Sequence, residues 1–251
     1  MKDRFSTQSG AYAQFRPHYP KILFDDILKH VPYISRQAAW DCATGNGQAA
    51  KVLANYFKKV YATDISQKQL GNAFISDNII YSIGKAEDSV FDPNMFDLIT
   101  VAQAIHWFDF ENFYAEAKRV AKPNAIVAIW GYGTLSLDYQ PLNTLFWHFY
   151  NHTIATYWDT ERRHIDAHYK TVPFPFRIIE TPQYEMVFKW NRVDFEGYLN
   201  TWSSVQNFQN KEGYNPVTNL MHDIRKYWKD GIKHTVRFPI FMTIGRVENI
   251  Q

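Results

Sequence analysis

"AWDCATGNGQAA", residues 39–50, joins a short apolar run that ends in Asp41 to a cluster of small residues. An apolar run bounded by small residues is typical of a buried strand, and the residues from 47 onward have a helical pattern. Glycines between the two allow the backbone to come close to a ligand. The stretch therefore predicts a strand, a ligand-binding turn and a helix in direct succession.

Strand-like and helix-like patterns alternate over the first half of the chain. We expect helices at 21–31, 47–57, 66–76 and 109–121, and strands at 38–41, 59–64, 79–84, 96–104 and 125–130. Strands that alternate with helices of this length form a parallel, doubly wound sheet, whose ligands bind beyond the carboxyl ends of the strands. The residues expected at that rim are 41–47, 64–66, 86–88 and 103–108.

The pattern changes after residue 131. Residues 134–182 are aromatic, helical and rich in His and Arg; then come a strand at 184–190, helices near 194–207 and 216–229, and a closing strand at 235–247. We therefore expect an α/β fold: a doubly wound, mostly parallel, seven-stranded Rossmann-like sheet with an antiparallel last strand and an inserted helical cap. The expected units are an N-terminal segment and Rossmann-like core (1–133), the cap (134–182), and final strands and helices that complete the core (183–251).

The composition excludes several classes of function. The formal net charge is +2 over 251 residues with no basic stripe, which argues against a nucleic-acid or membrane partner. The single cysteine, Cys42, excludes an internal disulfide framework and suits a reducing compartment. No apolar run has signal-peptide or membrane-span character. We expect a cytoplasmic monomer or homodimer that acts on a small molecule.

Residues 45–50, Gly-Asn-Gly-Gln-Ala-Ala, match the G-x-G-x-x-G/A fingerprint of dinucleotide-binding turns. Asp64 follows the next predicted strand, where an acid would bind the ribose hydroxyls. Since several classes of nucleoside binder share an acid at this position, the fingerprint alone leaves the cofactor open.

Three features favour S-adenosylmethionine over NAD. Asp41 would repel a pyrophosphate but would welcome a cationic amino-acid group. Glu87 and Asp88 follow the third strand, where they can accept hydrogen bonds from an adenine amino group, and His106-Trp107 leave the fourth strand at the same rim. Purely structural roles stay open for all five residues: turn capping, solvated acids, and a core histidine and aromatic ring.

The sequence resembles the class I S-adenosylmethionine-dependent methyltransferases. The matching segments are "DCATGNG", "YATDIS", "GKAED", "FDLITVAQAIHWFD" and "AKRVAKPNAIVAIWGYG". Within that family it is similar to the trans-aconitate methyltransferase branch, through "FSTQSGAYAQFRPHYP" near the N-terminus and "YLNTWSSV" at 198–205. The likeness is good over 1–131, looser over 184–247 and weakest in the expected cap.

The resemblance implies which residues form each subsite. The cofactor set comprises Asp41, Ala43, Gly45, Gly47, Asp64, Ile65, Glu87, Asp88 and Gln103, and the acceptor set comprises Tyr12, Arg16, Tyr19, Trp107 and Trp202. Two departures from the family stand out: Ala43 replaces a common glycine, and "KPNA" replaces "KPGG". Alanine at 43 is tolerated unless the backbone there requires a positive φ.

The expected reaction is methyl transfer to a small molecule, with a carboxylic acid among the candidate acceptors. Enzymes of this kind mainly align the reactants. A carboxylate needs no general base, whereas an amine or hydroxyl acceptor would need one, for which His106 is the catalytic candidate. Arg16 could bind an acidic acceptor, or it could form a structural ion pair. Trp202, on an expected helix, could instead belong to the core.

Two H-x-x-x-H pairs, His148/His152 and His164/His168, would each share one helix face. Neither has the HExxH pattern and no cysteine supports them, so we expect no metal. Two alternative functions remain from the sequence. An NAD(P)-dependent oxidoreductase would fit the glycine fingerprint, and a non-catalytic S-adenosylmethionine-binding module would fit the departures at Ala43 and "KPNA".

Overall fold

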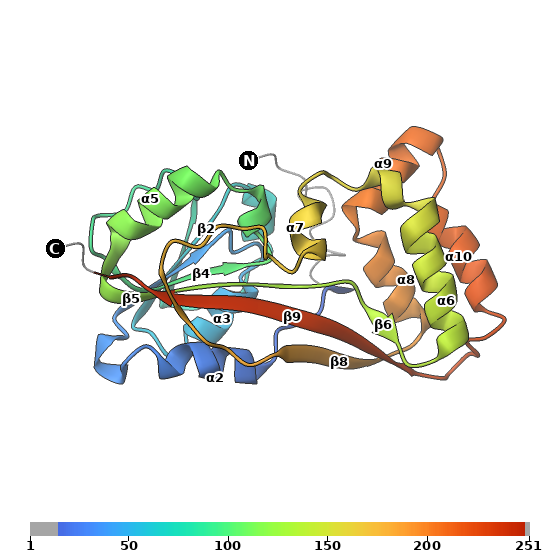
Figure 1. Ribbon diagram of the computed structural model, residues 1–251, viewed down its shortest axis with the longest axis horizontal. Helices are drawn as coiled ribbons and strands as arrows, with labels where there is room; N and C mark the ends of the chain where they lie inside the picture. The colour runs from blue at the N-terminus through green and yellow to red at the C-terminus, as the bar shows by residue number, and fades with distance from the viewer. Residues whose placement is uncertain (1–14, 249–251) are drawn as a thin grey trace.

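A mixed sheet forms the middle layer of the computed structural model, which describes residues 15–248 (Figure 1). Its parallel part has the order β3-β2-β1-β4-β5. These strands are β1 (Ala38–Cys42), β2 (Lys59–Asp64), β3 (Ile79–Ile83), β4 (Phe96–Ala102) and β5 (Ala121–Tyr132). Because the order reverses between β1 and β4, a crevice for a ligand is expected beyond the carboxyl ends of these strands.

The long strand β9 (His234–Arg246) lies antiparallel to β5 and connects two parts of the molecule. One end pairs with β5, and the other end pairs with β8 (Tyr184–Trp190) and β6 (Ser136–Leu137). The short strand β7 (Arg177–Ile179) pairs near the end of β9. In Figure 1, β9 runs in red from the parallel strands to the helices at the opposite end.

The predicted fold class is confirmed, including the antiparallel last strand. Within residues 15–248, all seven predicted strands are present, each shifted by a few residues at most. The additional strands β6 and β7 contain only 2 and 3 residues. Strands this short show no alternating pattern, which is why the sequence did not reveal them.

Helices cover both faces of the sheet. α2 (Lys21–Lys29) and α3 (Gln48–Leu53) lie on one face, and α5 (Phe110–Val120) lies on the other (Figure 1). The short helix α4 (Gln67–Leu70) follows β2. The predicted helices 47–57 and 66–76 are too long, because the first continues as turns after Leu53 and the second ends at Gly71. Ser66 is the N-cap of α4, and its hydroxyl accepts a hydrogen bond from the Gln69 amide, which stabilises the start of the helix.

A helical cap stands at the far end of β9 and is built from two segments of the chain (Figure 1). The first segment gives α6 (Gln140–His148), a π-helical turn (Phe149–Thr153) and a 3-10 turn (Ala155–Tyr157), and it continues to α7 (Arg162–Asp166), which lies between the cap helices and the sheet and contacts the Ile105–Trp107 turn (Figure 1). The second gives α8 (Arg192–Asn200), α9 (Ser203–Glu212) and α10 (Pro216–Ile224), and α10 packs against α6. The helices after 183 therefore join the cap, whereas the sequence assigned them to the core. Within residues 15–248, no helix has the length and apolar character needed to cross a bilayer.

Two apolar clusters, one on each face, bury the sheet. Trp130 on β5 is fully buried on the α2 face, where Phe24 meets it edge to face with ring centroids 5.8 Å apart. Trp40 on β1 is fully buried on the α5 face and donates its indole N–H to the Thr63 hydroxyl at 2.9 Å. The strands are thus fixed from both sides, and their carboxyl ends form a rigid rim.

The turn after β1 has an unusual backbone. Ala43, Gly45 and Gly47 have φ values of +53°, +58° and +81°, all in the left-handed region. A Cβ on Gly47 would also collide with the Tyr81 hydroxyl. The position of Ala43 therefore does require a positive φ, and an L-residue there is strained by roughly 1–2 kcal/mol.

The buried carboxylate of Asp41 connects this turn to the sheet through hydrogen bonds. Its Oδ2 accepts hydrogen bonds from the Thr44 hydroxyl at 2.5 Å and the Ala50 amide at 3.0 Å, and its Oδ1 accepts one from the Thr100 hydroxyl at 2.8 Å. The side chain is 1% exposed, and burial raises its pKa to about 6. One carboxylate thus connects β1, the turn, α3 and β4.

Replacing Ala43 by glycine should stabilise the protein. Ala43→Gly removes the left-handed strain but adds freedom to the unfolded chain, so we expect a net gain of about 0.5–1 kcal/mol. Urea unfolding followed by circular dichroism measures this as a higher midpoint at an unchanged slope. A lower midpoint would contradict the assignment of strain to this residue.

The buried Asp41 should give stability a distinct pH dependence. The pKa of Asp41 is about 6 in the folded protein and about 4 when the chain is unfolded. Its contribution to the free energy of unfolding is therefore fully present below the unfolded pKa and is lost as pH rises through the folded pKa. The comparison variant is Asp41→Asn, which cannot ionise but keeps an oxygen for the Ala50 amide. The difference in unfolding free energy, wild type minus variant, should fall by on the order of 3 kcal/mol between pH 4 and pH 7. A difference that stays flat or rises with pH would contradict the raised pKa of Asp41.

Candidate active site

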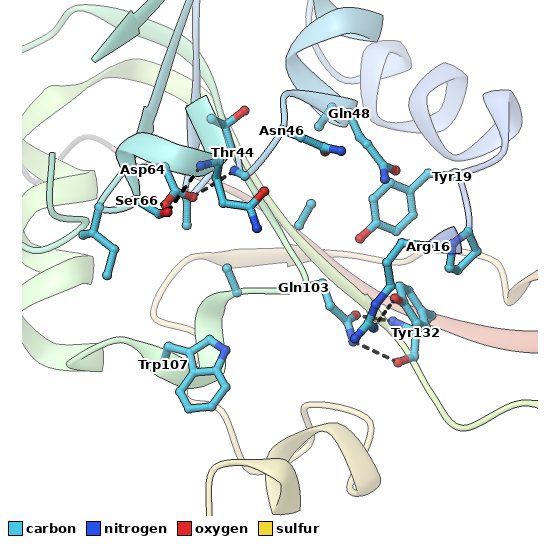
Figure 2. A pocket seen from close by; sticks show the side chains of 18 residues that line it. Arg16, Tyr19, Thr44, Asn46, Gln48, Asp64, Ser66, Gln103, Trp107 and Tyr132 are labelled. Carbon is cyan, nitrogen blue, oxygen red and sulfur yellow. Dashed lines mark hydrogen bonds between the residues drawn. The ribbon is translucent and has the colours of Figure 1, made fainter. Parts of the chain in front are cut away.

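A pocket of about 860 Å³, here called the rim pocket, lies beyond the carboxyl ends of β1, β2, β4 and β5 (Figure 2). Its walls come from four connections and from residues before α2. They are Arg16, Pro17, Tyr19, Ala43–Asn46, Gln48, Ala49, Asp64–Ser66, Gln69, Ala102–Ala104, Trp107 and Tyr132. The predicted rim of the sheet is therefore hollow, and residues from several strand ends converge on the hollow.

Asp64 stands at the end of β2 on the wall of the rim pocket. Its Oδ2 accepts a hydrogen bond from the Gly45 amide at 2.9 Å, and its Oδ1 accepts one from the Ser66 amide at 2.8 Å. These bonds fix the carboxylate against the glycine turn. A carboxylate at this wall has the chemistry to accept hydrogen bonds from hydroxyl groups of a ligand.

Gln48 at the start of α3 lines the same pocket. Its Oε1 is buried and has no hydrogen-bond partner within residues 15–248. A buried carbonyl without a partner costs roughly 1–3 kcal/mol. The placement therefore fits a ligand that brings a donor, such as an ammonium group. Gln48 occupies a variable position of the glycine fingerprint, so the motif carries no signal for its role.

The structure separates the predicted cofactor residues into two groups. Those that line the rim pocket are Ala43, Gly45, Asp64, Ile65 and Gln103. Those that do not line it are Asp41, Gly47, Glu87 and Asp88. Asp41 lies behind the wall and holds the turn, and Gly47 is the N-cap of α3. Glu87 instead accepts the Asp109 amide before α5 at 3.1 Å, and Asp88 is exposed.

A second pocket of about 520 Å³, the cap pocket, lies between the rim and the cap. It is lined by Arg16, Gln103, His106, Trp107, Trp158, Asp159, Arg162, Ile165, Trp202 and Ser203. Arg16, Gln103 and Trp107 also line the rim pocket, so the two pockets adjoin at these side chains. Two ligands could therefore meet there.

The junction of the pockets is held by hydrogen bonds to Tyr132, as the dashed lines in Figure 2 show. Gln103 Oε1 accepts from the Tyr132 amide at 2.7 Å, and Gln103 Nε2 donates to the Tyr132 carbonyl at 3.3 Å. Arg16 donates to the Tyr132 hydroxyl at 2.8 Å and to the Thr201 carbonyl at 3.1 Å, with its guanidinium over the Tyr198 ring. Arg16 thus combines the two roles considered from the sequence, since it braces the cap and also lines both pockets.

His106 lies in the 3-10 turn Ile105–Trp107 and lines the cap pocket. It is 5% exposed, and its Nδ1 is 2.9 Å from the Tyr169 hydroxyl. Burial lowers its pKa to about 3, with further lowering by Arg162 and His164. A general base works best with a pKa near the operating pH. His106 is therefore a neutral hydrogen-bonding group here and is poorly suited to the role of base.

The remaining predicted residues have varied placements. Tyr19 lines the rim pocket, and Trp202 lines the cap pocket although it is only 2% exposed. Tyr12 lies outside the described residues. The His148 and His152 rings are neighbours on an exposed surface, with centroids 4.9 Å apart. Within residues 15–248, no group of three or more His, Cys, Asp or Glu side chains could hold a metal ion.

Known proteins similar to this chain are methyltransferases. Residues 40–129 match a family described as a methyltransferase domain. A Dictyostelium discoideum protein assigned as a methyltransferase is 32% identical over 254 residues, which cover 98% of this chain and 95% of that protein. A Saccharomyces cerevisiae protein assigned as an S-adenosylmethionine-dependent methyltransferase is 28% identical over 50% of this chain and 45% of its own length.

The fold has a solved counterpart. The structure of an Anaeromyxobacter dehalogenans protein, assigned as a type II methyltransferase, matches with a TM-score of 0.84 at 35% identity, covering 93% of this chain and 99% of that one. Both full-length matches are to methyltransferases, so the oxidoreductase and non-catalytic alternatives are wrong. The cofactor is S-adenosylmethionine. The chain belongs to the class I S-adenosylmethionine-dependent methyltransferases.

Proposed function

We propose that this methyltransferase modifies a small molecule that binds in the cap pocket, and that the methylated group is a carboxylate. The observation that carries the proposal is the junction of the two pockets at Arg16, Gln103 and Trp107. A cofactor in the rim pocket and an acceptor in the cap pocket would meet there.

The rim pocket fits S-adenosylmethionine in its chemistry. Asp64 offers carboxylate oxygens for ribose hydroxyls, and Gln48 Oε1, which has no partner among residues 15–248, offers an acceptor for the α-ammonium group. Ile65 offers apolar surface beside Asp64. When bound, this cofactor supplies a methyl group on a positively charged sulfur. The protein's residues hold and align the reactants, which can contribute roughly 7–11 kcal/mol to catalysis.

The charges of the cap pocket favour an acidic acceptor. Arg16 and Arg162 line it together with a single acid, Asp159, while the low pKa of His106 keeps that residue neutral. A carboxylate is already nucleophilic, so its methylation requires no general base. The resemblance of the N-terminal segment to the trans-aconitate methyltransferase branch supports the same class of acceptor.

Activity is tested by incubating the protein with S-adenosylmethionine and a panel of small carboxylic acids. We expect methyl esters and stoichiometric S-adenosylhomocysteine, measured by mass spectrometry. The matching amides, which have the same shape without the charge, should give no product. Methylation of amines or hydroxyls alone would overturn the carboxylate proposal.

Asp64→Asn should weaken S-adenosylhomocysteine binding roughly tenfold or more, because it removes charge-assisted hydrogen bonds to the ribose. Isothermal titration calorimetry measures the dissociation constant. Asp88→Asn is the matched control, since Asp88 also follows a strand but is exposed and outside the pocket. Equal effects of the two substitutions would contradict the assignment of Asp64.

The depressed pKa of His106 predicts a flat pH profile. His106 should stay neutral from pH 6 to pH 8, so kcat/KM for a carboxylate acceptor should vary less than about threefold over that range. His106→Gln should retain measurable turnover, because an amide can still bond to Tyr169. A rate that titrates near pH 6.5 in the wild type and vanishes in this variant would restore the role of general base.

A further inference from the structure

Three indole rings from different parts of the chain line the cap pocket. Trp107 comes from the turn after β4, Trp158 from the segment before α7, and Trp202 from the N-cap of α9. The Trp158 and Trp202 ring centroids are 5.2 Å apart. Trp158 Nε1 is buried and has no hydrogen-bond partner within residues 15–248. Trp107 and Trp158 are only partly buried, and their flat rings together with the Trp158 N–H suit a planar ring that carries an acceptor group.

Arg162 on α7 is held in place beside these rings. Its Nε donates to the Tyr150 hydroxyl at 3.2 Å and to Asp166 Oδ1 at 3.0 Å, and its Nη2 donates to the Thr134 hydroxyl at 2.7 Å. The guanidinium lies over the Trp158 ring, 4.4 Å from its centroid, and the side chain is 15% exposed. Its Nη1 donates no hydrogen bond within residues 15–248. This preorganised group can therefore bind an anion in the pocket.

The position of Arg162 separates two functions of the pocket. Arg162 lines the cap pocket but not the rim pocket, whereas Arg16, Gln103 and Trp107 line both pockets. An acid held by Arg162 thus lies away from the junction where methyl transfer is proposed. Asp159 on the same wall and Asp166, which pairs with Arg162 Nε at 3.0 Å, both reduce the positive charge, so the anchor depends on the directed N–H donors of Arg162 rather than on excess charge.

We propose that the acceptor is a planar aromatic diacid, with one carboxylate anchored by Arg162, the ring against the tryptophans, and the second carboxylate at the junction. This inference rests on the proposed function and names its substrate class. A carboxylate oxygen at the junction forms a bond to the methyl carbon while the carbon–sulfur bond breaks and its electron pair stays on sulfur. No proton moves, and the product is the monomethyl ester with S-adenosylhomocysteine.

The test measures binding to the protein saturated with S-adenosylhomocysteine, by calorimetry. Benzene-1,4-dicarboxylate and the longer naphthalene-2,6-dicarboxylate are the diacid probes. Benzoate and 2-naphthoate lack the second acid, and trans-cyclohexane-1,4-dicarboxylate lacks the aromatic ring. We expect at least one aromatic diacid to bind roughly tenfold or more tightly than its monoacid and than the cyclohexane diacid.

Arg162→Gln should remove the preference for the diacid over the monoacid without changing S-adenosylhomocysteine affinity. Arg163→Gln is the matched control, because Arg163 is the next residue on α7, is exposed and lines neither pocket. Arg162→Lys keeps the charge and should retain part of the preference if Arg162→Gln perturbs the fold, which thermal unfolding reports.

Equal diacid preference in the two glutamine variants would overturn the proposal, as would binding of no aromatic diacid to protein that binds S-adenosylhomocysteine. Failure of the wild type to bind S-adenosylhomocysteine would instead overturn the proposed cofactor site. Methyl esters formed only from non-aromatic acids would leave the proposed function intact and overturn the proposal that the acceptor is an aromatic diacid.

Discussion

The buried carboxylate of Asp41 is the constraint on which the rest of the site depends. It accepts hydrogen bonds from the turn, from the first turn of α3 and from β4, so one side chain fixes three elements relative to one another. That arrangement holds Gly45 where its amide reaches Asp64. Burial raises the pKa of the Asp41 carboxyl. The hydrogen bonds that it accepts hold the strained backbone of the turn at the wall of the rim pocket.

Much of the sheet follows from local sequence pattern, because β1 and β4 are buried on both faces and the helices α4 and α5 have capping side chains. Ser66 and Asp109 mark helix starts for this reason, since each accepts a backbone hydrogen bond from three residues ahead. The composition of the cap was harder to predict. Packing of α10 against α6 joins segments far apart in the chain, and no local periodicity encodes such a contact.

The lining of the rim pocket was predictable where a strand end alone fixes the place of a side chain, as for Asp64 and Gln103. The lining was not predictable where the direction of a side chain depends on tertiary contacts. Glu87 follows β3 as expected, yet it turns to the start of α5 and misses the pocket. Arg162 lies in a charged segment, and only the fold brings it into one pocket with His106 and Trp202. The low basicity of His106 likewise depends on burial by the cap.

The strand β9 has a consequence for how the protein is made. Its 13 residues span about 43 Å at ~3.3 Å per residue, and along the chain it follows every other strand in residues 15–248. On a ribosome, β5 and β8 would therefore both wait with an unpaired edge until the last strand is synthesised. Such edges invite pairing with other chains. We therefore expect the nascent chain to depend on a chaperone, because a single strand made late in synthesis joins the sheet to the cap.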